Sequence, residues 1–441
     1  MPITRRKLPA LLLMLCSVTI SLPTSANELP AHRVSNIEFN GAKRTDKAWL
    51  STFLKVDLPQ ELTKTDISRL LVKLQNTALF KEIDYELRRN PDNDGYTLVF
   101  HLEEKWTTIP VVRGVFGGGT PLRVVGAYDI NLLGQNKVLG GEFRKYGDAP
   151  TGGVAYYRDP HALSGKAFIG AEVWQNHRIR DFYSEENHHY GSAQLNTKEL
   201  KLRFLQQNSG TTLLDGSLKY GLELKHMMSA KAQFTPSAGD DAPAEVQFGD
   251  SYTSQLNLLP TIQYDNIKLS NLNLHGVRSI AKAGLMKRDK NRSLMEFEFF
   301  GYNLFSPNTN AAFHLFYGQH QSQEVENLYY LGGFDSIRGL PDGALIGRRA
   351  VYANVELRHT LKTWKYLWLQ PTVFSDAGNA KMQGPLFDGN HRSSSGVGIR
   401  LSIPQIHRMV FRFDYAWSTD GSNTQGLNIG MNQFFQPYRP L

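Results

Sequence analysis

Cysteine is nearly absent from this chain, since Cys16 is the only one among 441 residues. It lies in an apolar run near the N-terminus that has the pattern of a secretory signal, with three basic residues before the run and a small-residue cleavage site at Ala26. We expect residues 1–26 to be removed on export, and Cys16 with them. A mature chain without thiols excludes disulfide frameworks, cysteine-based metal sites and a cysteine nucleophile.

Long apolar runs are also missing after the expected signal. A run of about eighteen apolar residues, the usual mark of a transmembrane helix, does not occur there. A membrane protein built from strands remains compatible with this, because each strand of an outer-membrane barrel needs only about ten residues, half of them polar.

Catalytic and nucleic-acid-binding motifs are scarce too. The chain lacks Gly-x-Ser-x-Gly and His-Glu-x-x-His, and His188 and His189 fall in a polar stretch that supports no metal site. Basic residues are scattered without an aromatic-basic module, so nucleic acid is excluded as a partner class. We therefore predict no enzyme activity, no cofactor and no metal. A scattered Ser-His-Asp set leaves no sequence signature, so a hydrolase stays open as an alternative.

Residues 31–105 predict a small α+β unit. Apolar residues alternate or recur at helical spacing in the order β-α-α-β-β, over residues 33–39, 45–53, 65–77, 80–88 and 96–103. We expect Thr45 and Thr65 to be the N-caps of the two helices. The turn before Tyr96 resembles half of a calcium loop, but His101 stands where calcium needs a glutamate, so we predict a plain hairpin turn.

From Thr107 to Phe435 the hydrophobic pattern has period two. Phe411 and Phe413, for example, alternate with Arg412 and Asp414. A soluble β-sandwich alternates as well, so periodicity alone leaves both classes open.

The connections favour a barrel. We count sixteen candidate strands, starting near residues 109, 121, 135, 152, 166, 194, 213, 252, 274, 292, 310, 349, 367, 393, 407 and 425. One set of connections is mostly short, and the other includes long polar loops at residues 179–193, 226–250, 321–348 and 379–392. This asymmetry is typical of outer-membrane barrels. We therefore predict a mainly β protein, with a sixteen-stranded antiparallel transmembrane β-barrel over residues 107–435 and a C-terminal extension of unassigned role at residues 436–441.

The loop between two of these strands carries a single arginine among glycines. Gly332, Gly333 and Gly339 allow backbone angles that other residues avoid, so the loop can fold back tightly around Arg338. A guanidinium is suited to docking against a carboxylate in a hydrated cavity, and Asp376 at the end of a later strand is the candidate partner.

Several motifs resemble, in order, those of the BamA/TamA-type superfamily of outer-membrane assembly and secretion barrels, also called bacterial surface antigen barrels. They are Asn76-Thr-Ala-Leu-Phe80, Gly126-Ala-Tyr-Asp129, Tyr157-Arg-Asp-Pro160, Ile337-Arg-Gly339, Phe374-Ser-Asp-Ala-Gly378 and Gly396-Val-Gly-Ile-Arg400. In that family, periplasmic POTRA domains precede a sixteen-stranded barrel. The resemblance thus implies that residues 31–105 are one POTRA-like module in the periplasm and that the barrel lies in the outer membrane of a Gram-negative-type bacterium.

The resemblance also implies roles for particular residues. The family's arginine loop folds into the lumen between the eleventh and twelfth strands and meets the aspartate of a Phe-x-Asp-x-Gly strand. The matching residues here are Gly332, Gly333, Ile337, Arg338 and Gly339 in the loop, and Phe374, Asp376 and Gly378 in the strand. The chain departs from the family pattern at Leu340, where an aromatic residue is usual, and in having a single POTRA module.

A non-enzymatic role in inserting, assembling or translocating other proteins is the expected function. Client segments would pair with the edge of the POTRA sheet and with the seam between the first and last barrel strands. Pro110 and Gly114 would weaken that seam. The seam residues are Val111, Val115, Leu427, Ile429 and Phe435.

The expected partners are unfolded or nascent outer-membrane or secreted proteins, the lipid bilayer, and a periplasmic or inner-membrane protein on the POTRA module. Two alternatives remain open. One is a dedicated secretion pore for a single partner protein, and the other is a receptor or adhesin barrel that uses its long loops.

Overall fold

The computed structural model describes residues 31–431, except for residues 92–94, 116–119, 185–187, 209–215, 231, 238–240, 242, 250, 271–272, 388–390 and 407–408. The expected signal at residues 1–26, the extension at residues 436–441 and the seam residue Phe435 lie outside the described residues.

The N-terminal domain is a four-stranded mixed sheet with two helices. Its elements are β1 (His32–Asn40), α1 (Lys47–Leu54), β2 (Gln60–Leu62), α2 (Lys64–Thr77), β3 (Phe80–Arg89) and β4 (Tyr96–Glu104), and the strand order is β2-β1-β4-β3. The predicted β3–β4 hairpin is confirmed. The prediction missed β2, because a strand of three residues is too short to show a hydrophobic period; it pairs antiparallel with the start of β1.

Both predicted helix N-caps are wrong. Asp46 caps α1, since its carboxylate accepts a hydrogen bond of 2.8 Å from the backbone N–H of Ala48. Thr63 caps α2 in a capping box with Asp66, in which each side chain accepts from the other residue's backbone N–H. The predicted cap Thr65 lies inside α2.

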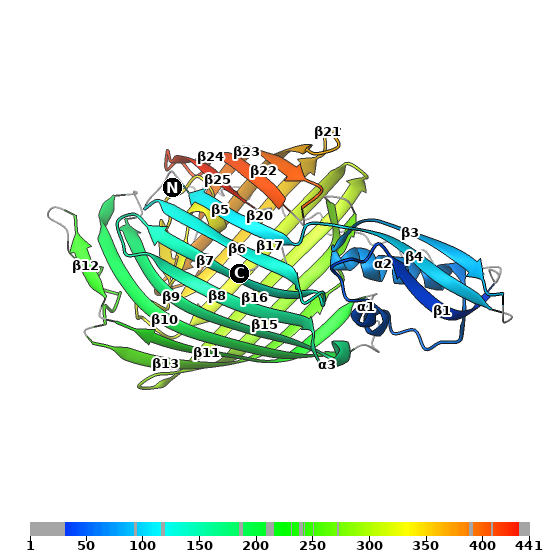
Figure 1. Cartoon of the computed structure of the whole chain (residues 1–441). Helices are drawn as coiled ribbons and strands as arrows, with labels where there is room; N and C mark the ends of the chain where they lie inside the picture. The colour runs from blue at the N-terminus through cyan, green and yellow to red at the C-terminus, as the bar shows by residue number, and fades with distance from the viewer. Residues whose placement is uncertain are drawn as a thin grey trace, which may run out of the picture.

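The described residues from Thr108 to Met431 form a closed antiparallel barrel of sixteen long strands, which confirms the predicted fold (Figure 1). The strands are β5 (Thr108–Val115), β6 (Leu122–Leu132), β7 (Lys137–Tyr146), β8 (Gly152–His161), β9 (Ala167–Tyr183), β10 (His189–Asn208), β11 (Ser217–Ser229), β13 (Thr253–Asp265), β15 (Asn273–Lys287), β16 (Asn291–Ser306), β17 (Thr309–His320), β20 (Arg349–His359), β22 (Trp368–Lys381), β23 (Arg392–Ile403), β24 (Met409–Ser418) and β25 (Gln425–Met431). Short elements in the connections are α3 (Ala162–Gly165), β12 (Gln233–Pro236), β14 (Lys268–Ser270), β18 (Tyr329–Leu331), η1 (Gly333–Asp335), β19 (Leu345–Gly347) and β21 (Lys362–Thr363).

One of the predicted long loops is largely strand, and another begins later than predicted. β9 runs to Tyr183 and β10 begins at His189, so most of residues 179–193 continues the hairpin. β22 likewise reaches Lys381, inside the loop predicted at residues 379–392. Polar residues in these extensions still pair backbone to backbone, and composition does not reveal that pairing.

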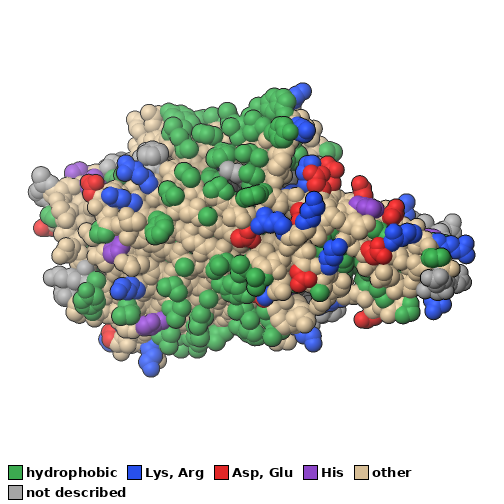
Figure 2. All heavy atoms as spheres, viewed as in Figure 1, with side chains coloured by type: hydrophobic (Ala, Val, Ile, Leu, Met, Phe, Trp, Pro, Cys, Tyr) green, Lys and Arg blue, Asp and Glu red, His purple; other side chains and the backbone are tan. Residues whose placement is uncertain are grey.

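The barrel wall is apolar outside and polar inside. On β24, Phe413, Tyr415 and Trp417 are 38%, 43% and 41% exposed, whereas Arg412 and Asp414 are fully buried in the lumen. On the barrel face that Figure 2 shows, hydrophobic side chains form several patches. Among the helices that the structure describes, none is long and apolar enough to cross a membrane.

The N-terminal domain lies against the end of the barrel where β5 begins (Figure 1). Asp46 donates its backbone N–H to the carbonyl of Gly134 at 3.0 Å, and the Asn131 side chain donates to the Thr45 hydroxyl at 3.0 Å. The ring of Phe53 packs edge-on against His161, with centroids 4.8 Å apart. These contacts fix the domain over one mouth of the lumen.

Candidate functional site: the lumenal arginine loop and the barrel seam

The arginine loop connects β17 and β20, the eleventh and twelfth long strands of the barrel. Its base is closed by pairing of β18 with β19. Gly332, Gly333 and Gly339 have φ angles of 125°, 66° and 83°, which favour glycine. The hydroxyl of Ser336 accepts from the Gly332 backbone N–H and donates to its carbonyl, which holds the turn closed.

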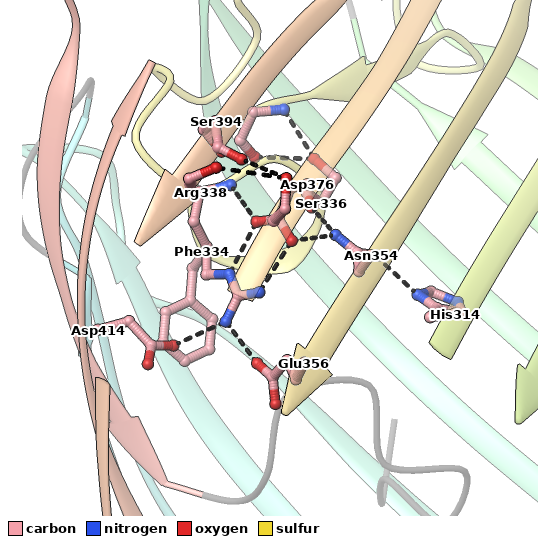
Figure 3. Close-up of polar contacts among 12 residues, drawn as sticks. His314, Phe334, Ser336, Arg338, Asn354, Glu356, Asp376, Ser394 and Asp414 are labelled. Carbon is pink, nitrogen blue, oxygen red and sulfur yellow. Dashed lines mark hydrogen bonds and ion pairs between the residues drawn. The ribbon is translucent and has the colours of Figure 1, made fainter. Parts of the chain in front are cut away.

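The structure brings Arg338 and Asp376 together (Figure 3). Nε and Nη2 of Arg338 each donate to a different carboxylate oxygen of Asp376 at 2.8 Å, and the Arg338 backbone N–H donates to the same carboxylate at 3.0 Å. The exposed fractions are 0% for Arg338 and 1% for Asp376. Bidentate pairing of this kind fixes both distance and orientation.

The ion pair belongs to a larger buried network that sequence analysis missed. Nη1 of Arg338 also donates to Glu356 and, at 3.2 Å, to Asp414. Further guanidiniums contact these two carboxylates; they come from Arg358, Arg400 and Arg412. The alternation on β24 marks Arg412 and Asp414 as inward-facing, but only strand register places them beside the loop.

Aromatic rings complete the arginine site. The guanidinium carbon of Arg338 lies 3.4 Å from the centroid of the Phe374 ring, and that of Arg412 lies 3.5 Å from the centroid of Phe334. Phe334 also packs closely on Gly430 of β25. The loop therefore contacts the last barrel strand as well as β22.

A polar chain extends from the loop across neighbouring strands. The Asn354 side chain donates to the Ser336 carbonyl at 2.6 Å and to Asp376 at 2.9 Å. Ring nitrogens of His314 lie 3.1 Å from the Asn354 side-chain oxygen and 3.0 Å from Glu298. The loop is thus connected to β16, β17, β20 and β22.

The remaining loop residues pack in an apolar cluster. Ile337 and Leu340 are 0% and 1% exposed and contact Leu331, Ala344, Ala350 and Ala380. Gly378 lies under this cluster, since a Cβ added there would meet the Ile337 side chain at 3.0 Å. Leu340, which departs from the family pattern, therefore occupies a fully buried apolar position.

The pairing of β25 with β5 is short within the described residues. Only two residue pairs join these strands in the described part of the chain, Asn428 with Val115 and Ile429 with Gly114. Seven pairs join β24 to β25 and eight join β5 to β6. Beside the seam, the backbone N–H of Val112 donates to the sulfur of Met431 at 3.1 Å, where a longer ladder would offer it a carbonyl.

Other predicted seam residues divide between the two faces of the wall. Val111 is 2% exposed and faces inward, whereas Leu427 is 46% exposed and faces outward.

Among the described residues, no group of three or more His, Cys, Asp or Glu side chains is arranged to hold a metal ion.

A closed sixteen-strand barrel with a polar lumen, an in-folded arginine loop and a small domain at one mouth defines the class of outer-membrane β-barrel proteins. The chain belongs to the Omp85 superfamily, because the superfamily domain matches residues 131–435. Membership implies a bacterial outer-membrane location and a role with substrate proteins there, in a family whose members are generally non-enzymatic transporters and insertases.

Three solved structures share this fold at low sequence identity. BamA from Haemophilus ducreyi lacking POTRA domains 1-3 is 16% identical, with a TM-score of 0.53 over 90% of this chain and 84% of that one. CdiB from Acinetobacter baumannii is 12% identical, with a TM-score of 0.60 over 91% and 73%. CdiB from Escherichia coli is 13% identical, with a TM-score of 0.56 over 93% and 92%. No curated protein matches the sequence.

Proposed function

We propose that this chain assists the insertion, assembly or translocation of other proteins at the outer membrane by pairing strands with them. The short seam is the observation that carries this proposal. Among the described residues only two pairs join β25 to β5, so separating this part of the two strands breaks few backbone hydrogen bonds. The freed edges would offer N–H and C=O groups to an extended client segment.

The N-terminal domain, residues 31–105, acts in this proposal as a POTRA module in the periplasm. Its sheet has two edges, β2 and β3. β2 has three residues, whereas β3 runs over ten, from Phe80 to Arg89, and pairs only on its β4 side in the described structure. The long edge of β3 is therefore the proposed docking site for a client or for a periplasmic or inner-membrane partner.

The arginine loop stabilises the wall next to the seam. Arg338 joins acidic residues of β20, β22 and β24, and Phe334 packs on Gly430 of β25. These contacts support a mechanism in which β25 stays with the rigid C-terminal wall while β5 moves away. The loop residues Gly332, Gly333, Ile337, Arg338 and Gly339 then set which side of the seam opens.

A disulfide across the seam tests the proposal. Gly114→Cys combined with Ile429→Cys joins directly paired residues of β5 and β25. Phe413→Cys combined with the same Ile429→Cys is the matched control, because it joins β24 to β25 away from the seam.

Photo-crosslinking residues placed along β3, β5 and β25 in growing cells report client capture. We expect unrelated nascent barrels to be captured, capture to fall in the oxidised seam variant, and reductant to restore it. Unchanged client capture with the seam locked would contradict a mechanism in which β5 separates from β25.

A dedicated secretion pore is the second candidate function. The lumen contains a cavity of about 1020 Å³, which favours passage of a chain through the barrel. Capture of one secreted protein by lumenal crosslinkers, together with ion conductance in planar bilayers, would support this candidate. A receptor or adhesin barrel would capture no client at either place.

A further inference from the structure

The lumenal cavity lies along the wall that leads from β5 to β17 and reaches the N-terminal domain. Its lining includes Phe53 and Lys73 of the domain, Arg144 and Trp174 of the barrel wall, and Lys219 of β11. At about 1020 Å³ it is at the upper end of the range for ligand sites, which is about 300–1,000 Å³.

The lining of this cavity is strongly basic. Among the described residues, eleven Lys and Arg side chains line it against five Asp and Glu side chains. A low-dielectric wall around a cavity lined by charge of one sign concentrates counter-charged groups inside it.

Carboxylates that pair with these bases reduce the excess but do not cancel it. Glu172 is already counted in the lining, and Glu142 and Glu223 lie outside it, so eleven bases face seven acids when both are included. Three buried glutamates each pair with two bases: Glu142 with Arg113 and Arg144, Glu172 with Arg158 and Lys201, and Glu223 with Arg203 and Lys282. The glutamates are 4%, 5% and 2% exposed. Each trio therefore carries one net positive charge toward the cavity.

Lys219 of β11 adds a further cation to the lining. It forms no ion pair within 4 Å in the described part of the chain, and its amino group lies 5.8 Å from the centroid of the Phe168 ring. Arg203 lies over the same ring at 6.0 Å, and Arg144 lies over Trp174 at 4.7 Å. Flat apolar surfaces thus alternate with positive charges along the wall.

We propose that this cavity binds an acidic, extended polypeptide segment. This proposal rests on the proposed function and names the substrate class for it. The bases are spread over strands from β5 to β15 and do not converge on one point, so they match a row of carboxylates better than a single small anion. The aromatic rings supply contact for the intervening residues.

Peptide binding to the full-length protein in phosphatidylcholine nanodiscs tests this. The probes are fluorescein-labelled peptides of alternating Glu and Ser, Gln and Ser, or Lys and Ser, followed by fluorescence anisotropy. We expect the Glu peptide alone to bind, and added salt to weaken it because screening reduces charge attraction. Lys219→Gln should weaken binding roughly tenfold, the effect of losing a little over 1 kcal/mol of attraction.

Two variants control for folding and position. Lys219→Arg keeps the charge and should retain binding, and Lys287→Gln removes an exposed lysine that lies outside the cavity lining and should change nothing. Heat-modifiable gel mobility shows that each barrel is folded. Equal binding of the Glu and Gln peptides, or normal binding by folded Lys219→Gln, would overturn the proposal.

This test separates the inference from the function on which it rests. If clients are captured in cells but the purified protein shows no preference for the Glu peptide, only the ligand class of the cavity is overturned. Specific binding of the Glu peptide without client capture would uphold the ligand class and remove the assembly and translocation role.

Discussion

The side chains of Arg338 and Asp376 face each other through two parallel hydrogen bonds of 2.8 Å, and both are buried in the barrel lumen. They are 38 positions apart in sequence. They meet because the arginine loop folds into the lumen and Asp376 lies on the inward face of β22. The pair is therefore a tertiary link between the loop and the wall, in addition to being an ion pair.

Replacing this arginine should destabilise the barrel strongly. Arg338→Ala leaves Asp376 buried without its guanidinium, at a cost of roughly 3–5 kcal/mol in the free energy of unfolding. Urea unfolding of the detergent-solubilised protein, followed by tryptophan fluorescence, measures this. Arg123→Ala, at an exposed position on β6, is the control and should change stability by less than about 0.5 kcal/mol. Similar midpoints for the two variants would mean that the buried pair contributes little.

The sequence predicted the barrel well because alternation and turn chemistry are local signals. The predicted start of β20 at Arg349 and that of β25 at Gln425 are correct, and most other starts lie within three residues of the observed ones. The network around Arg338 was only partly predictable. Asp376 follows from a motif, but Glu356 and Asp414 join the site through strand register and inward curvature, which no local pattern encodes.

The helix N-caps also could not be predicted from residue type alone. Thr63 and Thr65 have the same side chain and lie two residues apart, yet only Thr63 accepts from the Asp66 backbone N–H. Thr63→Ala should therefore cost about 1 kcal/mol of domain stability, whereas Thr65→Ala, at an exposed site, should cost much less. Hydrogen exchange of the first turn of α2 in the full protein measures both. Equal loss of protection would show that the capping box contributes nothing.

Acid should loosen the contact between Glu104 and the chain before α1. Burial raises the pKa of Glu104, but hydrogen bonds from Thr45, Arg44 and Lys43 outweigh burial and lower it below its ordinary value of 4.5. Because the folded-state pKa is the lower one, the carboxylate contributes its full stabilisation above pH 4.5, and this is lost as pH falls through the folded-state pKa.

Hydrogen exchange at the backbone amide of Thr45, corrected for intrinsic rates, measures that loss. Glu104→Gln should remove most of the pH dependence, and Glu103→Gln, whose side chain is 54% exposed, should leave it intact. Protection that stays constant from neutral pH to pH 3, about one and a half units below the ordinary glutamate value, would contradict this account.

Gly134 of the barrel lies directly against the backbone of the N-terminal domain. Gly134 has a φ of 73°, and a Cβ added there would lie 2.6 Å from both the Arg44 carbonyl oxygen and the Asp46 backbone nitrogen. Gly134→Ala should therefore push the domain off the mouth of the lumen, since these backbone atoms cannot yield as a flexible side chain would. Gly421→Ala is the matched control, because Gly421 has a similar φ of 86° and no atom within 4 Å of an added Cβ.

Spin labels at two exposed positions, Arg69 on α2 and Lys198 on β10, report the distance between domain and barrel. We expect a single narrow distance distribution in the parent protein and in Gly421→Ala, and a broader or longer one in Gly134→Ala. Both glycine variants carry similar backbone strain, so a difference between them isolates the steric contact at the interface. Identical distributions in all three proteins would mean that the domain is held by its linker alone, and that the contacts of Thr45, Asp46 and Phe53 with the barrel do not determine its position.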